Sequence, residues 1–202
     1  MPVRSVLVWA GLAIAVAVPM VIAATSPLLA WRHPIYIASG FAGVVALSLI
    51  LVQPLLAAGY LPGLPVRSGR RGHRWIGVAL VIAVVAHVGG LWITSAPDVI
   101  DALVFESPTP FSVWGVLAMW AVFAAALLAV MRAPLRIRPR VWRLAHSGLA
   151  VVIALGSVAH ALLVEGTMGQ VSKAALCILV LAALIKVLID LRTWSLLSRR
   201  RT

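Results

Sequence analysis

The sequence has few acidic residues and few charges of either sign. Only five of the 202 residues are Asp or Glu, and charged residues make up 11% of the chain, against 63% hydrophobic residues. Globular domains are about half apolar and about a quarter charged. A soluble fold of this size needs a polar surface that this composition does not provide. With a mean hydropathy of +1.09, the chain is predicted to be a membrane protein.

Cysteine and the common catalytic motifs are also scarce. Because Cys177 is the single cysteine, an internal disulfide is excluded. Cys177 lies inside an apolar segment. We find no Ser/His/Asp constellation, no paired carboxylates, no His-Glu-x-x-His motif and no Gly-rich phosphate loop after a strand. We therefore expect no acid–base or nucleophilic catalytic residue in this chain.

Six apolar segments are long enough to cross a bilayer, which takes about 20 helical residues. They cover approximately residues 6–30, 35–60, 75–96, 112–131, 142–164 and 174–193. The first is longer than the apolar region of a signal peptide, about 7–15 residues, so we expect it to be retained. The connection 97–111 is expected to be an extracytoplasmic loop. The prediction is an all-α protein, a six-helix transmembrane bundle, with residues 1–202 forming one domain and no soluble flavin or nicotinamide domain.

The basic residues predict how the bundle is oriented. Fourteen arginines fall on one side of the predicted spans. They are Arg4, Arg67, Arg70, Arg71, Arg74, Arg132, Arg136, Arg138, Arg140, Arg143, Arg192, Arg199, Arg200 and Arg201. Arg32, Lys173 and four of the five acids (Asp98, Asp101, Glu106, Glu165) fall on the other side. The positive-inside rule then places both termini in the cytoplasm of a multi-pass plasma-membrane protein. The net charge of +12 is explained by topology, so no nucleic-acid partner is expected.

Several polar and aromatic residues are explained by the membrane boundaries. Five tryptophans near span ends are expected to be interfacial anchors: Trp31, Trp75, Trp92, Trp142 and Trp194. Lys186 and Asp190 are four residues apart in the last span and are expected to form an ion pair. His33 lies in the short turn between the first two spans and is expected to be interfacial.

The other four histidines form two matched pairs. His73 and His87 lie fourteen residues apart in the third span, and His146 and His160 lie fourteen residues apart in the fifth. Fourteen helical residues rise about 21 Å and return to within about 40° of the same face. Both spans are odd-numbered and therefore run in the same direction across the membrane. His73 should then be level with His146, and His87 with His160.

Two facing imidazoles at each of two depths are what two stacked six-coordinate haems require. One alternative is that each histidine only hydrogen-bonds a neighbouring helix. Another is that the histidines bind a non-haem transition metal or relay protons in a small transporter. Against transport, the spans lack the carboxylates and broken helices typical of a transport path.

Glycines and arginines near these histidines could contact the same cofactor. Gly77 and Gly148, with Gly89, Gly90 and Gly156, would let a flat macrocycle approach the backbone, although close helix packing explains them equally well. Arg70, Arg71, Arg74 and Arg143 cluster beside His73 and His146 and could pair with haem propionates. Membrane topology and anionic lipid headgroups are the alternative for each arginine.

The segments Arg71-Gly72-His73-Arg74-Trp75-Ile76-Gly77 through His87, and Trp142-Arg143-Leu144-Ala145-His146 through His160, resemble a known family. It is the ferric-reductase-like transmembrane domain of ferric reductases, NADPH oxidases and the haem-binding membrane subunit of bacterial periplasmic methionine sulfoxide reductase. The resemblance covers essentially the whole chain as a six-helix domain, with its specific motifs in the third and fifth spans.

The resemblance implies electron transfer across the membrane through b-type haems. An inner haem would be held by His73 and His146, and an outer haem by His87 and His160. The donor would be a cytoplasmic reductase or flavoprotein, a membrane quinol, or a bound flavin, and the acceptor would be an extracytoplasmic molecule or partner enzyme. Four candidate ligands favour two haems, because the sulfoxide reductase subunit is expected to lack a ligand at His73. A single haem on His87 and His160, serving a periplasmic reductase, is the alternative.

Overall fold

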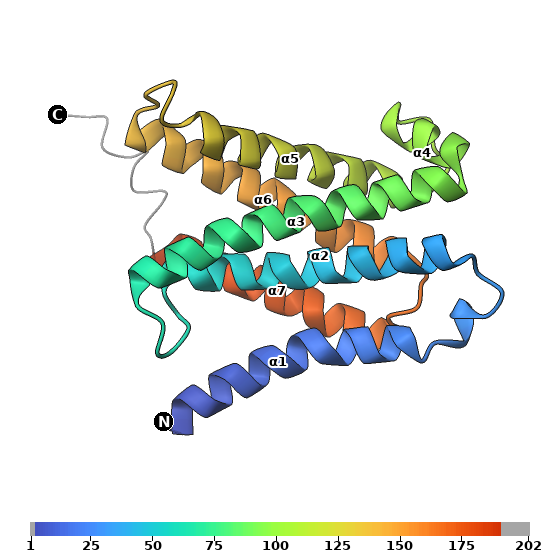
Figure 1. Cartoon of the computed structure of the whole chain (residues 1–202), viewed down its shortest axis with the longest axis horizontal. Coiled ribbons are helices and arrows are strands. Elements are labelled where there is room, and N and C mark those ends of the chain that lie inside the picture. Colours follow the sequence, from blue (N-terminus) through green and yellow to red (C-terminus); the bar gives the residue numbers. More distant parts are fainter. Residues whose placement is uncertain (1–2, 191–202) are drawn as a thin grey trace.

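A computed structural model describes residues 3–190 and shows an all-helical bundle (Figure 1). Within these residues it contains seven α-helices, one short 3-10 helix and no strand. In chain order they are α1 (Val3–Ala24), η1 (Pro27–Leu29), α2 (Pro34–Ala58), α3 (Val66–Thr94), α4 (Ala96–Leu103), α5 (Ser112–Met131), α6 (Pro139–Leu163) and α7 (Gln170–Asp190). All of these α-helices except α4 are long and apolar enough to cross a membrane, which confirms the six predicted spans.

The helices differ most from the predicted segments at three places. Helix α3 begins at Val66, nine residues before the apolar segment, and so includes the arginines that the sequence placed in a connection. Helix α1 ends at Ala24, before the 3-10 turn that starts at Pro27. The connection 97–111 is not all loop, because α4 occupies its first part. Apolarity marks only the part of a helix inside the hydrocarbon, so it does not detect polar or short helices outside it.

Helices α2 and α3 form a tightly packed hairpin. Gly59 ends α2 in the left-handed conformation at φ 73°, and its N–H donates to the carbonyls of Leu55 and Leu56. A Cβ atom added to Gly69 would lie 2.8 Å from the carbonyl oxygen of Leu56, so glycine allows the two backbones to approach closely. This hairpin places α3 firmly against α2 on one side of the molecule.

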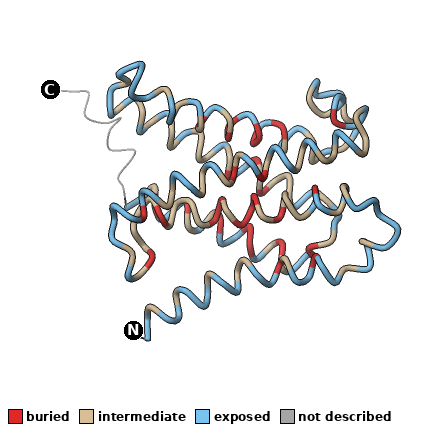
Figure 2. Tube along the Cα trace, viewed as in Figure 1, coloured by how far each residue is buried: buried red, intermediate tan, exposed pale blue. Residues whose placement is uncertain are grey.

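The buried core lies at the middle of the bundle, where α2 and α7 meet the other helices (Figure 2). Leu51 of α2 is 3% exposed, and Leu176 and Val180 of α7 are each 1% exposed. Many large apolar side chains on the outer faces of the helices are exposed instead, as expected for surfaces in contact with lipid. The predicted bilayer partner is thus consistent with the distribution of burial.

The arginine-rich segments gather at one end of the bundle. Figure 1 shows the start of α1, the α2–α3 connection and the α5–α6 connection at the same end, and α4 and the α6–α7 connection at the opposite end. This arrangement agrees with the charge segregation, while the cytoplasmic orientation of the arginine-rich end stays a prediction. The predicted positions Arg192, Trp194, Arg199, Arg200 and Arg201 lie outside the described residues.

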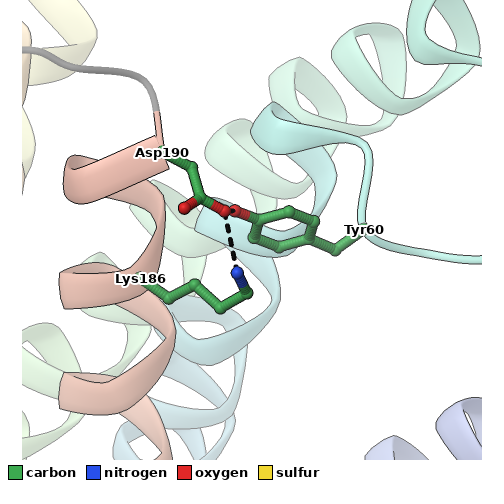
Figure 3. Close-up of polar contacts among 3 residues, drawn as sticks. All are labelled: Tyr60, Lys186 and Asp190. Carbon is green, nitrogen blue, oxygen red and sulfur yellow. Dashed lines mark hydrogen bonds and ion pairs between the residues drawn. The ribbon is translucent and has the colours of Figure 1, made fainter.

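The expected ion pair is present at the end of α7 (Figure 3). Lys186 Nζ lies 2.8 Å from a carboxylate oxygen of Asp190. The hydroxyl of Tyr60, from the α2–α3 connection, donates to the same carboxylate, and the ammonium lies 4.9 Å from the centroid of the Tyr60 ring. Sequence spacing found the pair but missed Tyr60. The three side chains join the α2–α3 connection to α7.

Candidate functional site

The structure brings the four intramembrane histidines together in the two pairs expected from their spacing. The ring centroids of His73 on α3 and His146 on α6 are 6.1 Å apart, with planes at 76°. Those of His87 and His160, farther along the same helices, are 6.3 Å apart, with planes at 80°. The pairs lie fourteen residues apart, a rise of about 21 Å. Two edge-on imidazole pairs therefore sit at two levels between α3 and α6.

The rings of the second pair are held by backbone carbonyls of neighbouring helices. Nδ1 of His87 lies 2.8 Å from the carbonyl oxygen of Ser39, and Nδ1 of His160 lies 2.9 Å from that of Phe111. A carbonyl can only accept a hydrogen bond, so Nδ1 carries the proton in both neutral rings. The lone pair is then on Nε2, which is the arrangement that metal-binding histidines use.

The first pair is held less evenly. Nδ1 of His73 lies 3.1 Å from the carbonyl oxygen of Gln53. Nδ1 of His146 is buried and has no hydrogen-bond partner among residues 3–190. Instead, the His146 ring stacks on the indole of Trp142, with centroids 5.1 Å apart and planes within 9°. The two histidines of this pair are thus supported by different interactions.

Two glycines on the neighbouring helices leave space for the second pair of rings. A Cβ atom added to Gly43 on α2 would lie 3.0 Å from Nδ1 of His87. A Cβ atom added to Gly115 on α5 would lie 2.6 Å from Nδ1 of His160. Any larger residue at Gly115 would collide with the ring, so α5 and α2 can approach the histidines only because these positions lack side chains.

The spacing within each pair fits two imidazoles bound on opposite sides of one metal. An imidazole–metal bond of about 2.0 Å and a nitrogen-to-centroid distance of about 1.1 Å on each side give centroids about 6.2 Å apart. The observed 6.1 and 6.3 Å bracket this value. Among the described residues, no group of three or more His, Cys, Asp or Glu could hold a metal ion. The pairs therefore fit a metal whose other ligands are not protein side chains, as in haem.

Of the residues predicted to contact a cofactor, two arginines line a surface pocket and one glycine packs against a neighbouring helix. Arg71 and Arg74, with Trp75 and Val78, line an open pocket of about 420 Å³ along an exposed face of α3, and His73 is not one of its lining residues. Gly77 lies against α2, since an added Cβ would be 3.2 Å from the side-chain amide of Gln53. This favours helix packing as the reason for Gly77.

The structure shows no specific contact that would assign a role to Gly148, Arg70 or Arg143 among the described residues. An added Cβ at Gly148 would meet no atom within 4 Å, so its flank is open. The structure shows no charged partner among the described residues for Arg70 on α3 or Arg143 on α6. Their roles, and that of Gly148, stay predictions.

A comparison with models of protein families shows which family the chain belongs to. The family model described as ferric reductase like transmembrane component matches residues 39–157, more than half of the sequence. The chain belongs to this family. The match includes His73, His87 and His146 and ends three residues before His160. No curated protein and no solved structure gives a significant match to the chain.

Sequence reasoning missed the residues that support the histidines. Gly43 and Gly115 are glycines inside apolar spans, and such glycines often mark a close contact. The sequence does not show that they face an imidazole, because this depends on the rotation of α2 and α5. Trp142 was expected to be an interfacial anchor, and its stacking on His146 was not foreseen. His33, which was expected to be interfacial, also caps α2, because its Nδ1 accepts a hydrogen bond from the N–H of Ile35.

Proposed function

We propose that this family member is a membrane electron-transfer component that binds two b-type haems, one at each histidine pair. The observation that carries the proposal is the pair of imidazole–imidazole separations, 6.1 Å for His73 with His146 and 6.3 Å for His87 with His160. Two such similar separations at two levels are not needed for helix packing alone. They are what axial ligation from both sides of a planar group requires.

The chain's own residues would hold the ligands and set their chemistry. When bound, the haem iron would supply reversible one-electron oxidation and reduction, which none of these side chains provides. The Ser39 and Phe111 carbonyls fix the tautomer of His87 and His160 and increase the basicity of Nε2. If both histidines of a pair held the iron, no coordination position would be left open, which would favour outer-sphere electron transfer.

Arginines close to His73 in sequence are proposed as partners for the carboxylates of the inner cofactor. Arg71 and Arg74 are close to this histidine in sequence on α3, and charge-assisted bonds from guanidinium groups to carboxylates are strong. Arg70 and Arg143 belong to the same arginine-rich end and are proposed as further partners. Gly148, with an open flank on α6, is proposed as a position where the macrocycle can approach the helix.

The direction of transfer and the partners are part of the same proposal. If the arginine-rich end faces the cytoplasm, as the positive-inside rule predicts, electrons enter beside His73 and His146 and leave beside His87 and His160. A cytoplasmic flavoprotein, a bound flavin or a membrane quinol would be the donor, and an extracytoplasmic molecule or enzyme the acceptor. Residues 1–202 would act as the single haem-binding transmembrane domain of such an oxidoreductase.

A haem count tests the proposal. The protein, expressed with adequate haem supply and purified in detergent, should show a reducible b-type spectrum with two haems per chain. His87→Ala should remove one haem and leave the other. His33→Ala is the matched control, because His33 only caps α2, and it should retain both. A colourless wild-type protein would contradict the proposal and favour a metal or proton transporter.

One observation favours a second version with a single haem. Within the described residues, His146 has no hydrogen-bond acceptor at Nδ1, whereas both members of the other pair have one. Metal-bound histidines almost always donate their second ring N–H. One haem per chain, retained in His73→Ala and lost in His87→Ala, would select the version in which only His87 and His160 are ligands.

A further inference from the structure

The two histidine pairs differ in how their rings are fixed. Three of the four Nδ1 atoms lie 2.8–3.1 Å from a backbone carbonyl oxygen of another helix. The fourth, that of His146, is buried and has no hydrogen-bond partner in the part of the chain that the structure describes. A ligand without this bond would be free to rotate about its side-chain torsions unless another contact restrained it.

A stacked tryptophan supplies the missing restraint. Trp142 precedes His146 by four residues, so the two side chains lie one above the other on the same face of α6. Their rings are nearly parallel, at 9°, with centroids 5.1 Å apart. The indole Nε1 of Trp142 is also buried, and no described residue is its hydrogen-bond partner. The tryptophan is therefore held by its ring faces and not by its polar atom.

An arginine from the preceding connection holds the tryptophan in turn. The guanidinium carbon of Arg132, at the end of α5, lies 4.3 Å from the centroid of the Trp142 ring. A guanidinium at this distance is attracted to the ring's negative face. Arg132, Trp142 and His146 thus form a continuous contact from the α5–α6 connection to the histidine, which we call the cation–indole–imidazole stack.

We propose that Trp142, held by Arg132, is a positioning residue that sets the orientation of His146 and distinguishes the inner haem from the outer one. This inference rests on the proposed function. Two consequences follow. The His146 plane is set by the Trp142 plane, to which it is parallel. An imidazole without a carbonyl acceptor is also a less basic ligand, so the inner haem should have the higher midpoint potential.

Substitutions of Trp142 test the role of the stack. Both haems are followed in the purified, haem-loaded protein by electron paramagnetic resonance and by optical redox titration. The inner haem is the one retained in His87→Ala. Trp142→Leu should change the g-values and the midpoint potential of the inner haem and leave the outer haem unchanged. Trp142→Phe keeps a stacking face without the N–H, so the g-values and midpoint potential of its inner haem should be close to those of the wild type.

Two further variants separate positioning from general packing. Arg132→Gln removes the cation from an exposed side chain and should lower the midpoint potential of the inner haem alone. Trp120→Leu makes the same change as Trp142→Leu at an exposed tryptophan whose aromatic contact is Phe123, and should leave both haems unchanged.

The outcomes that overturn the proposal are distinct from failure of the function. Unchanged inner-haem spectra and potentials in Trp142→Leu, or equal changes in both haems, would overturn the positioning role while two haems are still bound. If Trp142→Leu does not fold, an unchanged inner-haem midpoint potential in Arg132→Gln would overturn the role assigned to the stack. A protein with only the outer haem would overturn the inference by removing His146 as a ligand. Absence of any haem would overturn the proposed function itself.

Discussion

Gly115 lies so close to His160 that a single added carbon would collide with the ring. A Cβ atom at Gly115 would be 2.6 Å from Nδ1 and 2.9 Å from Cε1 of the imidazole. The same Nδ1 atom of His160 is hydrogen-bonded to the carbonyl oxygen of Phe111, which directly precedes α5. Helix α5 therefore both makes space for the ring and fixes it, and the two effects depend on glycine at this position.

Gly115→Ala should release the outer ligand without unfolding the protein. The added methyl group forces the His160 ring or helix α5 to move, at a cost typical of overpacking, about 1–3 kcal/mol. We expect the loss of one of the two haems and retention of the haem at His73 and His146. The measurement is haem content per chain, with the midpoint potential of the haem that remains.

Two other glycines on α2 provide the graded controls. Gly43→Ala places a Cβ 3.0 Å from Nδ1 of His87, a milder conflict, and should weaken outer-haem retention less than Gly115→Ala. Gly40→Ala has open space around the added atom and should retain both haems. Equal haem content in the Gly115 and Gly40 variants would contradict the role assigned to Gly115.

The sequence alone was enough to predict the spans and the pairing of the histidines. Helix period and span direction determine which residues share a face and a depth, and His73, His87, His146 and His160 satisfied both conditions. Both are properties of single helices and of their order along the chain. They do not require knowledge of how one helix is rotated against another.

The supporting contacts could not be predicted because they depend on that rotation. The Phe111 carbonyl reaches His160 only when α5 presents Gly115 to the ring. Trp142 is a suitable interfacial anchor by sequence, and its stacking on His146 depends on side-chain torsions. The early start of α3 at Val66 was hidden because its first turns are basic and not apolar.

Lys173→Met should destabilise the end of the bundle opposite the arginines. Lys173 is 4% exposed, and its Nζ donates to the carbonyl oxygen of Val164 at 2.6 Å, where α6 ends. A cation at a helix C-terminus is favourable, and an unsatisfied buried acceptor costs about 1–3 kcal/mol. Release of the buried charge offsets part of this cost, so the loss should lie near the lower figure. Thermal unfolding in detergent, followed by circular dichroism, measures it.

The control for Lys173 is the other lysine of α7. Lys186 is 62% exposed and pairs with Asp190 near the opposite end of the helix. Because exposed ion pairs contribute little, Lys186→Met should lower the unfolding temperature less than Lys173→Met does. A Lys173→Met protein at least as stable as the wild type would show that the buried ammonium is a net cost to the fold.

Tyr60 should titrate at higher pH than an ordinary tyrosine. Its hydroxyl donates to the Asp190 carboxylate, and this hydrogen bond, with burial and the nearby negative charge, raises the pKa of Tyr60 above its usual 10.0. The folded state therefore holds the phenol proton more tightly than the unfolded state. The stability from this contact is fully present below pH 10.0 and is lost as the pH rises through the higher folded pKa.

Phenolate absorbance measures this titration directly, because the chain has only two tyrosines. In a Tyr36→Phe background, the absorbance change reports Tyr60 alone. Asp190→Asn removes the negative charge and weakens the acceptor, so the midpoint should move down toward the ordinary value. Lys186→Met removes a cation that favours the phenolate, so the midpoint should move up. Identical midpoints with and without the Asp190 carboxylate would mean that the hydroxyl of Tyr60 does not bind it in solution, and that the α2–α3 connection is joined to α7 by other contacts.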